Sequence, residues 1–291
     1  MKGARLKHVG NSPMGGTLFE DGILHVGKYG YRGLGGKHPL YTQSITQRYA
    51  LGTRLITPDG RVFRYAKCSA TRTTGFCMMF NGGLFATVGV DGGAVLPVAI
   101  VAGDTTVTVT IAATDGSNQG SYEAADGAVA KNELFGGYLV IYGASNDREN
   151  RMIIGNTAKD AGAGTITIEV EEPFTEAHAV TIKVEIMANP WATLSMVAED
   201  YISVAGFPAC GNVTVNYYFW CQTWGPIRIS AQNYNLGESA GERNLWFGPD
   251  GSIRSSAIQG ATNCRQHAGF LIPRTSASYG LSGWMMLQIC P

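Results

Sequence analysis

Residues 134–186 decide the fold of this chain, and they read LFGGYLVIYG (134–143), ASNDREN (144–150), RMIIGNT (151–157), AKDAGAGTITIEVEEPF (158–174) and, after a short gap, VTIKVEI (180–186). In residues 164–171, Ile and Val occupy every second position, and Thr and Glu fill the positions between them. Residues 180–186 repeat this alternation. A period of two with β-branched residues is typical of a strand that buries one face. We therefore expect a β-rich domain.

The composition agrees with a β protein that has many turns. The chain has 291 residues, of which 45% are hydrophobic, 15% are charged and 39 are Gly. This length is sufficient for one large core or two smaller ones. Disordered chains combine low hydrophobicity with high net charge, so this composition argues against disorder.

Charge is unevenly distributed along the chain, although the formal net charge is zero. Residues 1–75 hold 12 Lys and Arg against 3 Asp and Glu, a net charge of +9, and residues 76–291 hold 10 against 19, a net charge of −9. The two parts could attract each other within a chain or between chains. The basic residues are spread among glycines and do not cluster, so we do not expect nucleic-acid binding.

The expected fold is mostly β, with an antiparallel sandwich-like or barrel-like body and an extended irregular N-terminal arm. Residues 1–47 show no sustained period and form this basic arm, and residues 48–291 form the body. Pro58-Asp59-Gly60 is a strong turn signal and predicts a hairpin over residues 49–67. A division of the body is expected near residues 187–205, and a short helix around residues 191–200.

Membrane, metal and cofactor functions receive no support from the sequence. The first 16 residues lack the apolar run of a signal peptide, and no stretch approaches the roughly 18 apolar residues of a membrane helix. We therefore expect a protein made in a cytoplasm that has no membrane partner and keeps its thiols buried and reduced. The six cysteines form no Cys-x-x-Cys motif, so we expect no metal site and no cofactor: Cys68, Cys77, Cys210, Cys221, Cys264 and Cys290.

No catalytic motif is present in the chain. The phosphate-binding GxxxxGK[ST], the metalloprotease HExxH, the nucleophile GxSxG and a dinucleotide-binding fingerprint are all missing from the sequence. The five histidines are scattered, and a catalytic triad could be drawn from such residues in almost any chain of this length. We therefore expect a protein that is not an enzyme and name no catalytic residue.

The aromatic stretch NVTVNYYFWCQTW (212–224) is the most informative candidate site. An alternating strand over residues 213–221 places large aromatic side chains on both faces, and Trp224 follows closely. A strand with one core face rarely leaves Trp in water. Three explanations stay open: packing between two layers of the same chain, contact with another subunit, and stacking on sugars. Tyr218, Trp220 and Trp224 are our candidates for a subunit interface.

Five segments, in this order along the chain, resemble capsid decoration (head cement) proteins of tailed phages. The match covers roughly residues 49–187 and 264–290. The segments are YALGTRLITPDGRVFRYAKC (49–68), NELFGGYLVIYG (132–143), RMIIGNT (151–157), GTITIEVEEPF (164–174), and QHAGFLIPRTSASYG (266–280) followed by MMLQI (285–289).

The resemblance implies a structural protein that binds the outside of an assembled capsid and bridges capsid subunits. Its partners would be the major capsid protein and further copies of itself, as a homodimer or homotrimer. It would act on the capsid exterior of the virion after synthesis in the host cytoplasm. The alternative is a glycan-binding tail adhesin or host-attachment module, in which Tyr218, Trp220 and Trp224 would stack on sugars.

Overall fold

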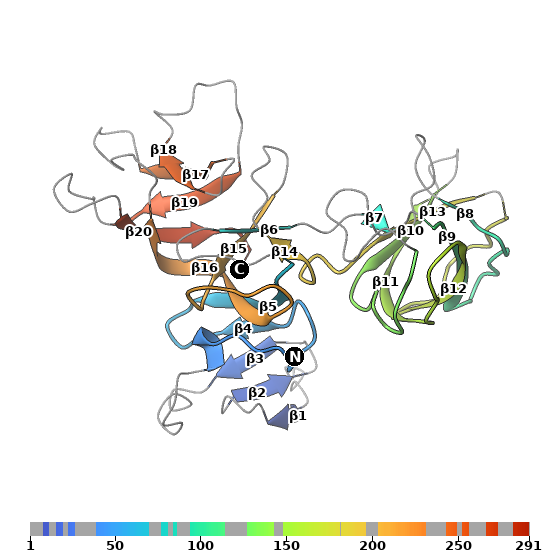
Figure 1. Cartoon of the computed structure of the whole chain (residues 1–291), viewed down its shortest axis with the longest axis horizontal. Coiled ribbons are helices and arrows are strands. Elements are labelled where there is room, and N and C mark those ends of the chain that lie inside the picture. Colours follow the sequence, from blue (N-terminus) through green and yellow to red (C-terminus); the bar gives the residue numbers. More distant parts are fainter. Residues whose placement is uncertain are drawn as a thin grey trace, which may run out of the picture. The chain divides into compact units, whose positions relative to one another are not determined.

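The computed structural model of the chain divides into two compact units, which Figure 1 shows. Unit 1 consists of residues 1–80 and 194–291, and unit 2 consists of residues 81–193, so unit 2 is inserted into unit 1. The second junction, after residue 193, falls within residues 187–205, and the first, after residue 80, has no counterpart in the sequence analysis. The residues that the structure describes are 8–11, 16–19, 23–26, 39–69, 77–80, 84–85, 94–113, 127–142, 148–180, 182–195, 203–230, 243–248, 252–255, 266–272 and 282–290.

Unit 2 is an antiparallel sheet that curls into a nearly closed barrel (Figure 1). Its strand order is β7-β13-β10-β11-β12-β9, and β8 also pairs with β13. The strands are β7 (Leu84–Phe85), β8 (Ala94–Val95), β9 (Thr106–Ile111), β10 (Tyr138–Tyr142), β11 (Arg148–Asn156), β12 (Gly164–Val170) and β13 (Lys183–Met187).

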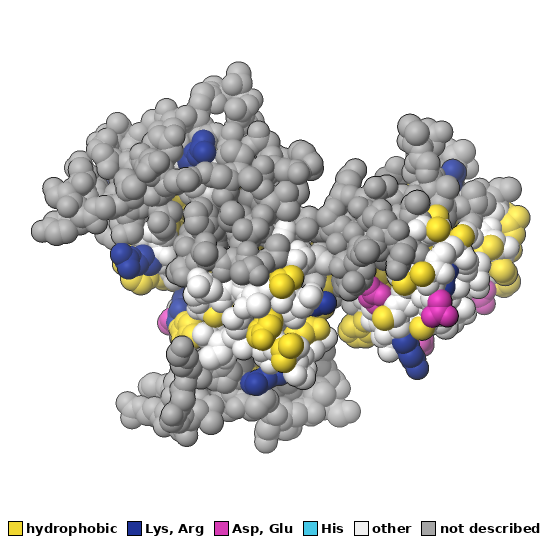
Figure 2. Space-filling model, viewed as in Figure 1, with side chains coloured by type: hydrophobic (Ala, Val, Ile, Leu, Met, Phe, Trp, Pro, Cys, Tyr) yellow, Lys and Arg dark blue, Asp and Glu magenta, His cyan; other side chains and the backbone are white. Residues whose placement is uncertain are grey.

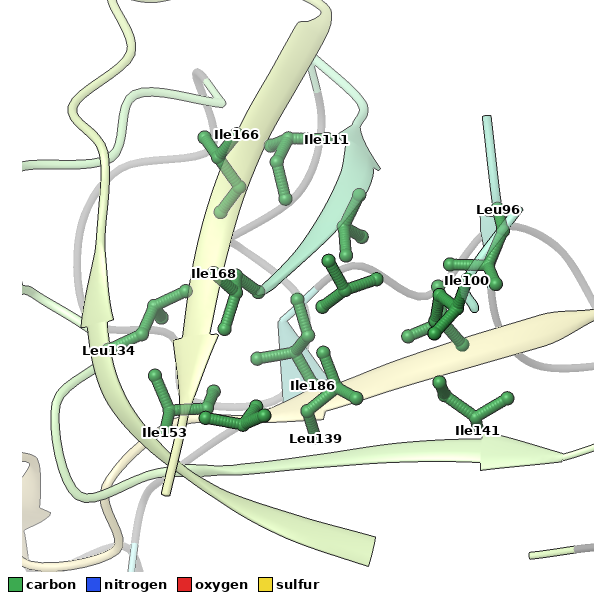
Figure 3. Packing of buried hydrophobic residues seen from close by; sticks show 14 of the residues in the cluster. Leu96, Ile100, Ile111, Leu134, Leu139, Ile141, Ile153, Ile166, Ile168 and Ile186 are labelled. Atoms are coloured by element: carbon green, nitrogen blue, oxygen red, sulfur yellow. The ribbon is translucent and has the colours of Figure 1, made fainter. Parts of the chain in front are cut away.

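The inward positions of these strands build the core of unit 2. In β12, Ile166, Ile168 and Val170 are buried while the Thr and Glu between them are exposed, as the alternation predicts. Figure 3 shows that these side chains meet those of the neighbouring strands, among them Leu139 and Ile186. The predicted strand over 180–186 begins only at Lys183, because Val180 lies in an exposed turn.

Unit 1 is a 13-stranded sheet whose long path is β1-β2-β3-β4-β5-β16-β20-β19-β17-β18. Branching from this path, β15 pairs with β16 and with β6, and β14 pairs with β6. A short 3-10 helix, η1 (Pro39–Tyr41), precedes β4. The strands are β1 (His8–Asn11), β2 (Gly16–Phe19), β3 (Ile23–Val26), β4 (Arg54–Ile56), β5 (Val62–Lys67), β6 (Met78–Phe80), β14 (Leu194–Ser195), β15 (Val204–Pro208), β16 (Tyr218–Ser230), β17 (Asn244–Phe247), β18 (Ile253–Ser255), β19 (His267–Leu271) and β20 (Ser282–Gln288).

The fold class predicted from the sequence is confirmed, and so is the hairpin over residues 49–67, in which β4 and β5 pair across the Pro58-Asp59-Gly60 turn. Two local predictions differ from the structure. Inside the arm of residues 1–47, the described residues of β1, β2 and β3 pair in sequence, and β3 pairs in parallel with β4. Strands of four residues are too short to show a period.

The predicted helix around residues 191–200 is wrong for its described part. Trp191 to Thr193 form a turn and a bend, and Leu194–Ser195 form β14, which pairs with β6. Residues 196–200 lie outside the described part of the chain. Leu194 is fully buried, so tertiary packing decides the conformation here.

Candidate functional site

Tyr218, Trp220 and Trp224 all lie on β16, but the structure gives them different environments. Trp220 is only 2% exposed, and its ring centroid lies 5.1 Å from that of Tyr65. Tyr218 is half-buried and stacks on Tyr65 at 6.0 Å with an interplanar angle of 10°. Trp224 is half-buried. The prediction of Trp220 as a subunit-interface residue is therefore wrong, because other residues of the same chain bury its side chain.

The burial of Trp220 follows from the central place of β16 in the sheet. The first half of β16 pairs with β5, so that Trp220 lies opposite Tyr65, and β15 joins the same region. Both faces of residues 219–223 are buried as a result. The predicted strand also begins too early, because β16 starts at Tyr218 and Asn216 has a φ of 64°. Packing within the chain thus explains the aromatic residues on both faces at this point.

The second half of β16 has one open face, and Trp224 lies on it. Here β16 pairs with β20, which in turn pairs with β19. The inward residues Ile229, Met285 and Leu287 are buried in one core cluster. The residues that alternate with the inward ones point away from this cluster and form what we call the outer face: Trp224, Pro226, Arg228, Phe270, Ile272, Trp284, Met286 and Gln288.

The outer face is continuous across the three strands. Arg228 lies opposite Trp284, and the amide of Ile272 donates a hydrogen bond to the Trp284 carbonyl at 2.9 Å. In the next row, Met286 lies between Pro226 and Phe270. Three of these residues are large, apolar and strongly exposed, at 49% for Trp284, 52% for Ile272 and 42% for Phe270.

A glycine sets the close approach of β19 to β20 beneath this face. Gly269 lies opposite Leu287 and has a φ of 140°. A Cβ atom at this position would overlap the carbonyl oxygen of Met286. Glycine is therefore required here both for its backbone conformation and for space. The neighbours Phe270 and Met286 thereby share one row of the outer face.

Chemically, the outer face is suited to binding a macromolecule. Exposed, contiguous apolar side chains on a folded surface mark interaction sites, and Trp, Phe, Met and Arg are the residues enriched in the centres of protein interfaces. Trp284 was missed by the sequence analysis. The signal was present in GWMMLQI (283–289), where Trp284 and Met286 alternate with Met285 and Leu287.

The most densely connected buried carboxylate in the described residues belongs to Glu149 in unit 2. It accepts hydrogen bonds from the Thr175 hydroxyl at 2.7 Å and from the backbone amides of Thr175 and Glu176. Arg151 adds an ion pair at 2.7 Å. These donors occupy the carboxylate and attach the segment after β12 to the barrel, so we assign Glu149 a structural role.

The hydrogen bonds at Glu149 have a consequence for acid stability. Burial by itself raises the pKa of the carboxyl, but the hydrogen bonds from Thr175 and Glu176 and the charge of Arg151 outweigh it and lower the pKa below its ordinary value of 4.5. A lowered pKa stabilises the fold at pH values above that of the unfolded carboxyl, and this stabilisation is lost as the pH falls through the folded value.

We therefore expect the free energy of unfolding to fall as the pH is lowered below about 4.5, and we expect Glu149→Gln to remove part of this dependence. Urea unfolding at pH values between about 3 and 7 measures both slopes. The same pH dependence of the free energy of unfolding in both proteins would contradict the structural role assigned to Glu149.

Four cysteines of unit 1 are buried and form no disulfide with another described residue: Cys68, Cys77, Cys210 and Cys221. Burial raises the pKa of Cys210 to about 11 and raises the pKa of Cys221 well above its ordinary value. Cys290 is a partly exposed thiol that forms no disulfide with another described residue. The described residues contain no group of three or more His, Cys, Asp or Glu side chains placed to hold a metal ion. The remaining cysteine, Cys264, lies outside the described residues.

Alkylation of the native protein is expected to modify Cys290 well before the four buried thiols. A pKa raised from 9.0 to about 11 lowers the thiolate fraction of Cys210 about a hundredfold at neutral pH, and burial also blocks the reagent. Peptide mapping by mass spectrometry, with and without denaturant, measures the extent of alkylation of each cysteine separately. Rapid native modification of Cys210 or Cys221 would contradict the packing described here.

Comparisons with protein families, with curated proteins and with solved structures find no match to this chain. Within the described residues, no helix has the length and apolar character needed to cross a membrane.

Proposed function

We propose that this protein is a structural, non-enzymatic component of a tailed-phage virion that binds the outer surface of the capsid and bridges its subunits. The observation that carries the proposal is the outer face of unit 1, where Trp284, Ile272 and Phe270 are exposed on a three-stranded surface. The resemblance of five ordered segments to capsid decoration proteins supplies the class of partner, the major capsid protein.

The chemistry of the outer face supports binding over catalysis. Its exposed side chains are apolar or, in the case of Arg228, cationic. An apolar centre with one cation is typical of protein interfaces. A binding surface on a capsid is repeated many times, so contacts that are weak individually give strong avidity.

The two ends of the resemblance also pair with the same strand, β16. Residues 266–280 include β19 and contribute Phe270 and Ile272 to the outer face, and residues 285–289 include the second half of β20 and contribute Met286. Trp284 lies between these two segments. Residues 49–68 include β5, which pairs with the other half of β16. Segments that are far apart in the chain therefore support one surface through the same central strand.

Co-sedimentation with empty heads of the phage that encodes the chain tests the proposal. We expect saturable binding at a fixed ratio to the major capsid protein, and we expect Trp284→Ala to weaken it at least tenfold, as for the central residues of other interfaces. Val101→Ala removes an exposed apolar side chain of unit 2, outside the outer face, and is the control that should bind normally.

The second candidate is the glycan-binding adhesin, since exposed aromatic rings such as those of Trp284 and Phe270 can stack on sugars. Of the three aromatic residues that the sequence suggested for sugar stacking, Trp220 is buried and cannot contact a glycan. No binding to heads, together with retention on host cells or immobilised glycans that Trp284→Ala abolishes, would overturn the capsid proposal in favour of the adhesin.

A further inference from the structure

The two units carry opposite charges of equal size. Unit 2 has 5 Lys and Arg against 14 Asp and Glu, a net charge of −9, and unit 1 has 17 against 8, a net charge of +9. The change from basic to acidic sequence after residue 75 thus lies close to the first boundary of unit 2, after residue 80. Surfaces of opposite sign steer association and raise its rate.

Unit 2 has an open groove of about 330 Å³ on the outside of its barrel, lined by Tyr138, Val140, Asn150, Glu185 and Met187. The register explains why these side chains meet. Tyr138 lies opposite Met187, and Val140 lies between Asn150 and Glu185. The residues that alternate with them, such as Leu139 and Ile186, are buried in the core.

The groove combines exposed apolar groups with a carboxylate. Tyr138 and Met187 are each 38% exposed, and the nearby Phe135 is 45% exposed. Glu185 is half-buried and forms no ion pair with another described residue. Figure 2 shows hydrophobic side chains next to acidic ones on the visible part of unit 2. Such a surface complements an apolar segment that carries a cation.

Unit 1 presents a segment of this kind in residues 39–50. Ile45 is 70% exposed, Tyr41 is 43% exposed, and Arg48 is exposed beside them in sequence. The Tyr41 hydroxyl accepts a hydrogen bond at 3.2 Å from Arg61, whose charge is paired with that of Asp59 at 2.7 Å, so Arg48 is the cation of this segment. We call Tyr41, Ile45 and Arg48 the basic strip.

The basic strip is held in place by hydrogen bonds on both sides of Ile45. Ser44 and Tyr218 exchange two backbone hydrogen bonds of 2.9 and 2.8 Å, and the amide of Thr214 donates to Gln43 Oε1 at 2.7 Å. The amide of Arg48 donates to the Tyr65 hydroxyl at 3.1 Å. A preorganised segment loses little conformational entropy when it binds.

We propose that the groove of unit 2 binds the basic strip of unit 1 from a second copy of this chain. Each copy then offers one acidic and one basic surface. The contact can be made twice in a two-fold dimer or in succession around a ring. The inference concerns self-association and does not depend on the capsid proposal.

Sedimentation velocity of the full chain, without heads, tests this contact. We expect concentration-dependent association at about 50 mM salt that weakens at about 1 M salt, because salt screens the attraction between the units. Glu185→Lys and Arg48→Glu should each raise the dissociation constant at least tenfold, since each places like charges opposite one another. The double variant Glu185→Lys with Arg48→Glu should recover most of the loss.

Asp160→Lys is the matched control, because it changes the net charge of unit 2 by the same amount at an exposed position. It follows β11, which continues four residues, about 13 Å, from Met152 opposite the groove residue Tyr138 to Asn156. We expect the dissociation constant of this variant to stay within about twofold of that of the unmodified protein.

Three results would overturn the proposal: a monomer at all concentrations, equal effects of Asp160→Lys and Glu185→Lys, or no recovery in the double variant. Thermal unfolding of each variant checks that its fold is intact. Failure here with normal binding to heads would refute this contact alone, and normal self-association without binding to heads would refute the capsid proposal alone.

Discussion

Replacing Glu149 with Ala is expected to lower the free energy of unfolding of unit 2 by about 3–5 kcal/mol, as for other buried pairs that lose one partner. The substitution leaves the amides of Thr175 and Glu176 without their acceptor. It also removes the ion-pair partner of Arg151, whose guanidinium keeps its hydrogen bonds to the carbonyls of Asn150 and Pro173. Buried donors without partners cost about 1–3 kcal/mol each. The backbone hydrogen bonds between Ile100 and His178 and the burial of Phe174 would still hold the segment of residues 171–178, so the loss is local to the carboxylate.

Hydrogen exchange in urea, read by mass spectrometry on peptides of residues 81–193, measures this change for unit 2 separately from unit 1. Glu171→Ala removes an exposed carboxylate from the same segment and is the control, with an expected effect within about 0.5 kcal/mol. A loss of less than about 1 kcal/mol for Glu149→Ala would contradict the structural role of this residue.

Trp220 and Trp284 form a matched pair that separates the core of unit 1 from its outer face. Trp220→Ala should cost about 3–5 kcal/mol, because it removes a buried ring that packs against Tyr65 and Tyr49. Trp284→Ala should cost less than about 1 kcal/mol, because about half of the side chain is already in solvent.

Binding to heads should show the opposite order. Trp284→Ala is expected to weaken binding at least tenfold, the loss typical of central interface residues, while the folded fraction of Trp220→Ala should bind normally. Urea unfolding and co-sedimentation on the same preparations give both quantities. A stability loss for Trp284→Ala as large as that for Trp220→Ala would mean that the outer face is part of the core.

The strands of unit 2 were predictable because their signal is local. In β12, the alternation of Ile166, Ile168 and Val170 with Thr and Glu states directly which side is buried. The hairpin of β4 and β5 was equally clear, since Pro58-Asp59-Gly60 fixes the turn between them. Each of these features depends on residues that are adjacent in the sequence.

The environment of Trp220 was not predictable from such signals. Period-two alternation assigns side chains to two faces, but it does not tell which neighbour covers each face. Here β5 places Tyr65 opposite Trp220, although the whole of unit 2 separates the two residues in the sequence. The insertion of unit 2 into unit 1 depends on this same long-range pairing and has no local signal at residue 80.

The outer face of unit 1 was predictable only in part. The alternation of Trp284 and Met286 with Met285 and Leu287 can be read from the sequence, and it separates the side chains into two sets. Both sets are apolar, so the pattern alone does not show which set is buried. The core cluster around Leu245, Ile229 and Leu287 decides this, and it draws residues from several distant strands.

Electron cryomicroscopy of heads incubated with the purified protein tests the central claim most directly. We predict ordered density for the protein on the capsid exterior, at positions that bridge neighbouring capsid subunits, with β19 and β20 facing the capsid surface. Heads without added density, or density at the tail alone, would contradict the claim.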